Sequence, residues 1–189
     1  MLGAVIERVD LPERRPHKNH FYALAREIIR QQLSGKAADA IERRFLALFS
    51  PRKNFFPKPE DISAMPDARM RASGLSYAKI SYLKNLSKAV ADNTLDFGRL
   101  AALADEDVIA ALTEIKGIGR WTAEMFLMFA LGRPDVFSYG DQGLKNAIKL
   151  LYKMRAHPTP RQAASIAARW RPHRTTACYY LWASLKFDS

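Results

Sequence analysis

The chain has 189 residues, of which 48% are hydrophobic. This length suits one globular domain with a core large enough to fold alone. The 30 lysines and arginines outnumber the 19 aspartates and glutamates, so the formal net charge is +11. Such an excess favours a polyanionic partner, most often nucleic acid, over a basic surface that is merely solvated.

The cysteine content and the hydropathy exclude several classes of protein. The single cysteine, Cys178, allows neither an internal disulfide nor a cysteine-ligated cluster, and it suits a reducing compartment. We expect no secretory signal and no membrane span, because no segment is apolar enough for either. The four histidines show no metal-ligand spacing, so we expect no catalytic metal and no cofactor.

Apolar residues recur at helical spacing along most of the chain, and strand alternation is almost absent, so we predict an all-α fold. Gly74 indicates a helix end. The residues that indicate helix starts are Ser34, Ser76, Asp105, Asp141 and Thr159. In chain order, helices are predicted over about 20–32, 34–48, 76–90, 105–115, 121–131, 141–152, 160–170 and 179–185.

Two segments interrupt the helical pattern. Residues 50–61, SPRKNFFPKPED, form a loop broken by prolines, and residues 132–140, GRPDVFSYG, form a second loop. The predicted helix 121–131, WTAEMFLMFAL, is apolar nearly all round. A helix of that kind is expected at the centre of the fold.

Residues 115–122, IKGIGRWT, join two predicted helices by a very tight turn. Its glycines allow positive φ angles and close approach of another backbone, and amides that open the second helix would face an anion. Such a turn would hold a phosphate without reading sequence, and the net charge favours this over a tight turn with no ligand. The expected phosphate-contact residues are Gly117, Gly119, Thr122, Lys116 and Arg120, with Lys36 as a further contact.

The stretch IKGIGRWTA resembles the helix-hairpin-helix of the DNA base-excision glycosylase superfamily. That superfamily follows the hairpin with a Gly/Pro-rich loop and an essential aspartate, which GRPDVFSYGD and Asp141 match. IIRQQLSGKAADAI and WRPHRTTACYYLW resemble two further segments of alkylbase glycosylases. Together, over about residues 20–187, these stretches are similar to 3-methyladenine DNA glycosylases of the type II bacterial and yeast kind.

The resemblance implies a single helix-hairpin-helix glycosylase domain over residues 1–189, with two helical lobes. Residues 36–133, with the hairpin at 115–121, would form the central lobe, and residues 1–35 and 134–189 the other. A DNA-binding and active-site cleft would lie between the lobes. We do not expect the additional N-terminal sheet domain of the larger bacterial members, or the iron–sulfur cluster that needs four cysteines.

The resemblance also implies an activity. The enzyme would be a monomer that binds double-stranded DNA and hydrolytically releases alkylated purines, above all 3-methyladenine and 7-methylguanine. Activity on ethenoadenine or hypoxanthine stays open. Bifunctional members have a lysine where this chain has Trp121, so no abasic-site lyase activity is expected. The location would be cytoplasmic in a prokaryote and nuclear in a eukaryote.

Two other functions remain open at this point. A non-catalytic protein that binds lesions would keep the hairpin and the pocket, although the presence of Asp141 argues against it. A glycosylase of the same superfamily for oxidised or mismatched bases is the second alternative. The missing hairpin lysine and the missing cysteines count against most such enzymes.

The chemistry of base release explains which residues the site needs. The target base must leave the duplex, and an alkylated purine carries a positive charge that weakens its glycosidic bond and attracts aromatic rings. A carboxylate stabilises the oxocarbenium-like sugar and orients the attacking water. We assign this role to Asp141, which by pattern alone is a helix N-cap; the two roles are compatible.

The resemblance assigns the remaining roles, and a structural role is the alternative for each. The base pocket is expected to contain Trp182, Trp121 and Met125, with Phe21 and Tyr22 along the same cleft. Core packing is the alternative for each of them, and it is favoured for Phe21.

Gln32 matches the residue that relatives insert into the duplex, although a helix-end polar residue on the surface is the alternative. Ser34 matches a minor-groove position or caps the next helix. Arg174 is expected to be structural, and Asp135 to be a loop aspartate. Hairpins of this family can hold a structural monovalent cation through carbonyls, here near Thr113, Lys116 and Ile118.

Overall fold

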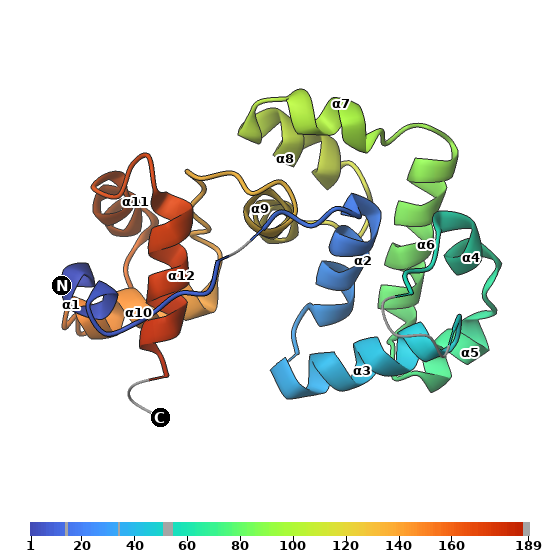
Figure 1. The fold of residues 1–189 in the computed structure, drawn as a ribbon, viewed down its shortest axis with the longest axis horizontal. Helices are drawn as coiled ribbons and strands as arrows, with labels where there is room; N and C mark the ends of the chain where they lie inside the picture. The colour runs from blue at the N-terminus through green and yellow to red at the C-terminus, as the bar shows by residue number, and fades with distance from the viewer. Residues whose placement is uncertain (14, 34, 51–54, 187–189) are drawn as a thin grey trace. The chain divides into compact units, whose positions relative to one another are not determined.

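A computed structural model describes residues 1–13, 15–33, 35–50 and 55–186 (Figure 1). Within these ranges all regular secondary structure is helical, which confirms the predicted all-α class. The chain divides into two compact units, one of Met1–Pro16 with Leu127–Ser189 and one of His17–Phe126. This division places residues 17–35 in the central unit, whereas the expected lobes assign them to the chain ends.

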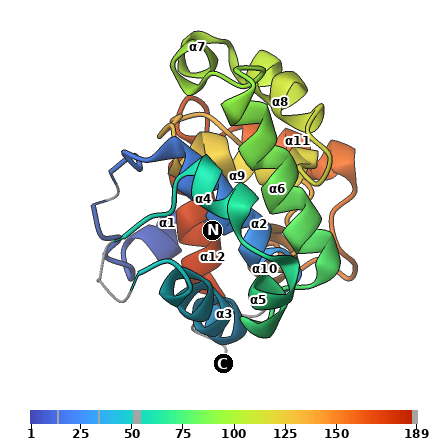
Figure 2. The ribbon, with the colours of Figure 1, turned by 90° about the vertical axis from the view of Figure 1, so that its right-hand side faces the viewer.

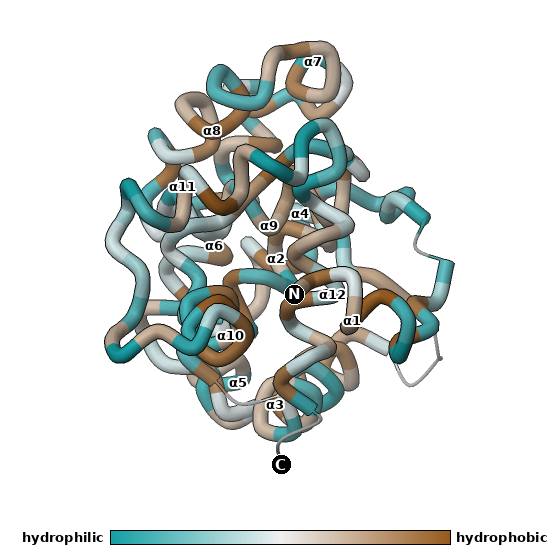
Figure 3. Tube along the Cα trace, turned by 90° about the vertical axis from the view of Figure 1, so that its left-hand side faces the viewer, coloured by the Kyte–Doolittle hydropathy of each residue, from teal (hydrophilic) through white to brown (hydrophobic). Residues whose placement is uncertain are grey.

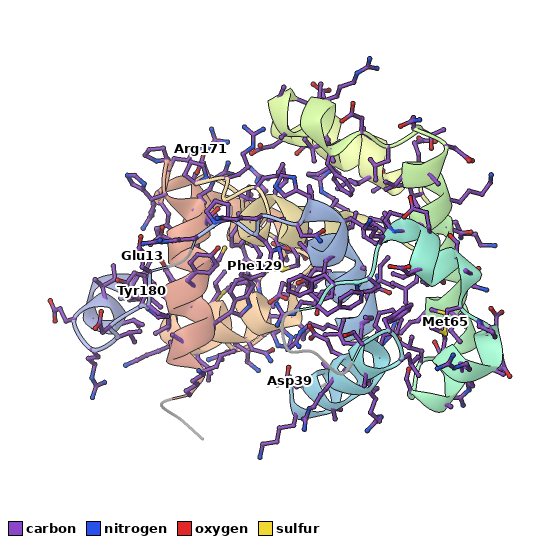
Figure 4. The ribbon with its side chains drawn as sticks, turned by 45° about the vertical axis from the view of Figure 1, so that its right-hand side comes forward. Glu13, Asp39, Met65, Phe129, Arg171 and Tyr180 are labelled. Carbon is purple, nitrogen blue, oxygen red and sulfur yellow. The ribbon has the colours of Figure 1, made fainter. Side chains whose placement is uncertain are left out.

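The central unit, His17–Phe126, is built around α6, on which α2, α4 and α5 pack (Figure 2). Leu24, Ile28, Phe45, Leu83 and Leu112 are fully buried in it. Met65 lies at the turn between α4 and α5 (Figure 4). The helices of the central unit are α2 (His20–Arg30), α3 (Gly35–Ala47), α4 (Pro59–Ala64), α5 (Asp67–Ala72), α6 (Tyr77–Ala91), α7 (Phe97–Ala102), α8 (Asp105–Thr113) and most of α9 (Arg120–Phe129).

The terminal unit combines both ends of the chain. In it α12 packs against α10 and α1. The apolar side of α10 buries Leu144, Ala147 and Ile148, and the trace of this helix is largely brown in Figure 3. Leu181 and the thiol-bearing Cys178 are completely buried on α12. The helices are α1 (Leu2–Ile6), the end of α9, α10 (Gln142–Leu151), α11 (Pro160–Ala168) and α12 (Arg174–Ser184).

Three predicted helix caps are confirmed by hydrogen bonds. The Ser76 side chain accepts from the Lys79 amide at 3.2 Å, at the start of α6. Thr159 accepts from the Gln162 amide at 3.3 Å, and the Gln162 side chain accepts from the Thr159 amide at 2.9 Å, which forms a capping box for α11. Asp141 caps α10, as described below. Gly74, with φ of +103°, follows the end of α5 as predicted.

The prediction that Asp105 caps a helix is wrong by one residue. The N-cap of α8 is Ala104, and Asp105 is the first helical residue. Asp105 still suits this end of α8, because it stands with Glu106 and Asp107 in a first turn whose partial positive charge favours carboxylates. The predicted cap at Ser34 lies outside the described residues.

Sequence periodicity missed several short helices. α1, α4, α5 and α7 each have five or six residues, too few for an apolar stripe to repeat. The predicted loop 50–61 overlaps the start of α4 at Pro59, whereas loop 132–140 contains no helix. The helix predicted over 121–131 is α9, and its residues 122–128 are buried. No helix among the described residues is long and apolar enough to cross a membrane.

Candidate active site

Asp141 caps α10 and is held by two donors. Its Oδ1 accepts a hydrogen bond from the Leu144 amide at 2.8 Å and from the Trp182 indole Nε1 at 2.8 Å. The first bond satisfies an amide at the helix end, and the positive end of the α10 dipole favours the carboxylate charge. The second bond links the carboxylate to α12. The orientation of this carboxylate is therefore determined by two helices of the terminal unit.

Trp182 belongs to a group of three aromatic rings. Its ring centroid lies 5.9 Å from that of Phe129, at an interplanar angle of 27°, and 6.0 Å from that of Tyr179. The rings of Tyr179 and of Phe129, the last residue of α9, stack with their centroids 5.6 Å apart (Figure 4). The Tyr179 hydroxyl donates to the Met128 carbonyl at 3.1 Å. Trp182 thus has packing partners besides its bond to Asp141, and its role as a base-pocket residue stays a prediction.

Gly143 permits the contact between Asp141 and Trp182. A Cβ atom on Gly143 would lie 3.0 Å from Trp182 Cδ1 and 3.1 Å from Asp141 Oδ1. Both distances are shorter than ordinary van der Waals contact. Sequence reasoning missed this residue, and its one signal is a glycine in the first turn of a helix, where glycine is otherwise unfavourable.

The loop that leads to Asp141 is anchored by Arg174 and Asp135. Arg174 Nε donates to Asp135 Oδ1 at 2.6 Å, and its terminal nitrogen donates to Oδ2 at 3.0 Å and to the Asp135 carbonyl at 2.5 Å. The hydrogen bond from Arg174 lowers the pKa of the Asp135 carboxyl below its ordinary value. Thr175 adds a hydrogen bond to the Arg133 carbonyl at 2.6 Å. Arg174 and Asp135 have the structural and loop positions that the sequence suggested.

The two hairpin glycines differ in what the fold requires of them. Gly117 has φ of +106°, and a Cβ on it would lie 2.1 Å from Tyr82 Cγ, so only glycine fits. Gly119 has no positive φ, and a Cβ on it would meet nothing within 4 Å among the described residues. The expected positive φ therefore holds for Gly117 alone, and the group that approaches it closely is the side chain of Tyr82 rather than another backbone. The side of Gly119 is open to a partner from outside.

Thr122 does not present its hydroxyl at the surface. The residue is 2% exposed, and its Oγ1 accepts a hydrogen bond from Gln31 Nε2 at 3.0 Å. The hydroxyl is thus buried beside Gln31, the residue that follows α2, and a phosphate contact from Thr122 stays a prediction. A phosphate contact from Thr122 would have to use its backbone amide.

Arg120 is bound by two carboxylates. It contacts Glu106 at 2.7 Å and Glu124 at 2.9 Å, and its side chain is 58% exposed. The hydrogen bond from Arg120 lowers the pKa of Glu106. Lys116 and Lys36 are exposed. Three cationic side chains are expected to contact phosphate. The two lysines are exposed at the surface, whereas the charge of Arg120 is paired with protein carboxylates.

The turn after α2 carries Gln32 in an unusual conformation. Gln32 is exposed and has φ of +55°, a left-handed region that residues other than glycine rarely adopt. Lys79 Nζ donates to the Ile29 carbonyl at 2.8 Å and to the Gln31 carbonyl at 2.7 Å, directly before Gln32. Sequence reasoning identified Gln32 but missed Lys79 and Gln31. Ser34, two residues later, lies outside the described residues.

The other expected pocket residues belong to the central unit. Phe21, Tyr22 and Met125 are 7%, 4% and 2% exposed, and Trp121 is half-buried. The Tyr22 hydroxyl donates to Glu42 Oε1 at 2.5 Å, and burial raises the pKa of Tyr22 well above its ordinary value. The burial of the first three fits core packing, and a pocket role stays a prediction for all four.

The expected cation site uses carbonyls of the hairpin. Asn85 Nδ2 donates to the Lys116 carbonyl at 3.2 Å, so one of the three expected carbonyls already has a protein partner. No cluster of three or more histidine, cysteine, aspartate or glutamate side chains that suits a metal ion occurs in the described part of the chain.

Comparisons with known proteins identify relatives of this chain. Residues 25–173 match the model of the HhH-GPD superfamily base excision DNA repair proteins. DNA-3-methyladenine glycosylase 1 of Schizosaccharomyces pombe is 38% identical over 170 residues, which cover 89% of this chain and 74% of that protein. The Bacillus subtilis protein YfjP is 36% identical over 162 residues, and the chain spans 56% of its length.

Solved structures give the same result for the fold. The S. pombe 3-methyladenine DNA glycosylase Mag1, in complex with abasic DNA, matches with a TM-score of 0.89 and 35% identity over 97% of this chain and 90% of that one. A DNA-3-methyladenine glycosidase from Bacillus halodurans matches with a TM-score of 0.77 and 37% identity. The match covers 97% of this chain and 83% of that one. This chain belongs to the HhH-GPD superfamily of base excision DNA repair proteins.

Proposed function

We propose that this protein is a monofunctional DNA-3-methyladenine glycosylase. It would release 3-methyladenine and 7-methylguanine from double-stranded DNA and leave an abasic site. The observation that carries the proposal is the carboxylate of Asp141, held by the Leu144 amide and the Trp182 indole directly after the loop that follows the hairpin. The names of the S. pombe and B. halodurans relatives support the substrate class.

Asp141 would act on the sugar rather than on the base. An alkylated purine leaves without strong general acid catalysis, because its positive charge already weakens the glycosidic bond. The fixed carboxylate then stabilises the developing charge on the sugar, and it orients the water that attacks the anomeric carbon. Two donors on one carboxylate oxygen keep this group in place before the substrate arrives.

The hairpin would hold the DNA backbone without reading its sequence. The amides that open α9 face an anion most easily at Gly119, where no side chain intervenes. Lys116 and Lys36 add charge from exposed positions, and the net charge of +11 favours DNA in general. A monovalent cation on the hairpin carbonyls would be structural. In this proposal Gln32 enters the duplex at the place of the flipped nucleotide.

The base pocket would contain aromatic and soft side chains. Trp182 and Trp121 offer ring faces to a cationic base, and Met125, Tyr22 and Phe21 complete the expected set. Trp121 stands where bifunctional relatives have a lysine, so it cannot form a Schiff base, and we expect no lyase step. The enzyme would act as a monomer, in the cytoplasm of a prokaryote or the nucleus of a eukaryote.

Base release from methylated DNA tests this proposal. Purified protein is incubated with the DNA, and the free bases are identified by chromatography beside an Asp141→Asn variant. Asparagine keeps the cap of α10, so the variant should fold. We expect the wild type to release 3-methyladenine and the variant to be slower by about 10²–10³-fold. Unchanged release by the variant would remove Asp141 from the mechanism.

The alternatives give different results in the same assay. A wild type that binds methylated DNA but releases no base would contradict the proposal. Duplexes with single oxidised or mismatched bases would then separate an enzyme for other lesions, which releases one of them, from a protein that only binds lesions.

A further inference from the structure

The C-terminal end of α2 is held by a lysine from α6. Lys79 Nζ donates to the carbonyl of Ile29, in the last turn of α2, and to that of Gln31, its C-cap residue. The last carbonyls of a helix have no partner within the helix itself. A cation suits this position, because the C-terminal end of a helix carries partial negative charge. Partial burial lowers the pKa of Lys79. The contact fixes the backbone immediately before Gln32.

The same side of α6 also holds the hairpin. Tyr82 and Asn85 follow Lys79 at intervals of three, a spacing that places side chains along one side of a helix. The Tyr82 ring lies against Gly117, and Asn85 Nδ2 donates to the Lys116 carbonyl at 3.2 Å. One side of α6 therefore contacts both the turn after α2 and the hairpin.

Gln31 joins these two segments directly. Its Nε2 donates to the Gly117 carbonyl at 3.1 Å and to Thr122 Oγ1 at 3.0 Å. A side-chain amide has two N–H groups, so these two bonds use both. Thr122 is 2% exposed, so water does not easily replace the bond to its hydroxyl.

Gln32 follows in a conformation that needs outside support. A glutamine with φ of +55° persists only where the surroundings impose it. The preceding residue provides that support, because its carbonyl is bound by Lys79 and its side chain by the hairpin. The conformation of the exposed Gln32 thus depends on contacts that also hold Gly117.

We propose that Gln31 is a positioning residue that couples the turn of residues 31–33, here called the insertion turn, to the hairpin. Gln32 then enters the duplex only while the hairpin grips the phosphate backbone. The inference rests on the proposed function, in which Gln32 is the inserted residue. Gln31 itself touches no DNA in this arrangement; it acts through Gln32 and Gly117.

A fluorescent duplex tests the coupling without any base release. The duplex carries an abasic-site analogue with 2-aminopurine beside it, and insertion at the site unstacks 2-aminopurine and raises its fluorescence. We expect Gln32→Ala to remove most of the rise. Gln31→Met keeps the length of the side chain but loses both hydrogen bonds, and it should lower the inserted population by about tenfold.

Two further variants make the test specific. Lys79→Met acts on the same turn from α6 and should lower the fluorescence rise in the same direction as Gln31→Met. Gln162→Met is the matched control, because it loses one glutamine hydrogen bond, to the Thr159 amide, in the terminal unit. It should leave the rise unchanged. Thermal unfolding of each variant checks that it folds. If Gln31→Met does not fold, the fluorescence of Lys79→Met tests the inference in its place.

Affinity for the abasic duplex completes a double-mutant cycle. If Gln31 acts through Gln32, then Gln31→Met should weaken binding in the wild type by about tenfold and by less than twofold in Gln32→Ala. Three results would each overturn the inference. Gln31→Met could give the same fluorescence rise as the wild type, it could lose the same affinity with and without Gln32→Ala, or Gln32→Ala could leave the fluorescence rise unchanged. Failure of the proposed function would appear separately, as absence of base release by the wild type.

Discussion

The turn at Asp141 and the hairpin at Gly117 both lead into a helix, α10 in one case and α9 in the other. At Asp141 the functional group is the side chain. Its carboxylate caps the helix, accepts a hydrogen bond from Trp182 and is the proposed catalytic group. At the hairpin, the side chains of Thr122 and Arg120 bind other protein groups. A ligand at the turn of Asp141 would therefore meet a side chain, whereas a ligand at the hairpin would meet mainly backbone amides and lysine side chains.

The largest expected effect distinguishes the hairpin glycines. Gly117→Ala should destabilise the fold by about 3 kcal/mol, because its Cβ would overlap the Tyr82 ring and its φ is unsuitable for alanine. Thermal unfolding should show a melting temperature lower by roughly 6–12 °C. A melting temperature within one degree of wild type would mean that the hairpin adapts and that the contact with Tyr82 is dispensable.

The next effect concerns the carboxylate. Trp182→Phe keeps a ring but loses the donor to Asp141, so the rate of base release in a single turnover should fall by about tenfold, with little change in DNA affinity. The loss should be equal for cationic 7-methylguanine and neutral hypoxanthine, if both are substrates, and absent in Asp141→Asn. A loss confined to the cationic base would assign Trp182 to base stacking instead.

Gly119→Ala complements the first variant. Its Cβ would enter open space, so the free energy of unfolding should change by less than about 0.5 kcal/mol. DNA affinity should nevertheless fall by about fivefold, because a methyl group would stand between the α9 amides and a phosphate. Binding to an undamaged duplex, measured by fluorescence anisotropy, checks this. Unchanged affinity would place the phosphate elsewhere.

The smallest effect tests the ion pairs of Arg120. Glu106→Gln removes one of two carboxylates from its guanidinium, and DNA affinity should rise by about twofold with a steeper dependence on salt. Anisotropy titrations at several salt concentrations give both quantities. Lower affinity in this variant would mean that Glu106 instead orients Arg120 toward the DNA.

Helix caps were predictable from the sequence, because a cap and the amide that it binds lie within a few residues of each other. Caps at Ser76, Asp141 and Thr159 each need a short polar side chain before an apolar stripe, and a sequence displays both. The cap at Asp105 was misplaced by one residue because acids are favoured both at the cap and in the first turn. Short helices such as α7 lack a repeat that could reveal them.

Features that depend on tertiary contact were not predictable in this way. Gln31 and Gly117 are 86 residues apart, and nothing near Gln31 in the sequence indicates its partner. The hydrogen bond that Thr122 accepts from Gln31 likewise joins residues 91 positions apart. The family resemblance selected Asp141 and Trp182, but their hydrogen bond and the need for Gly143 between them appear only in the folded chain.

The burial of Cys178 has a chemical consequence. A thiolate is a stronger nucleophile than a purine nitrogen, so it reacts readily with the same electrophiles that methylate DNA. The single cysteine of this chain lies on α12 and is completely buried, out of contact with solvent. A repair enzyme built this way keeps its most alkylation-sensitive side chain away from the reagents whose damaged bases it is proposed to remove.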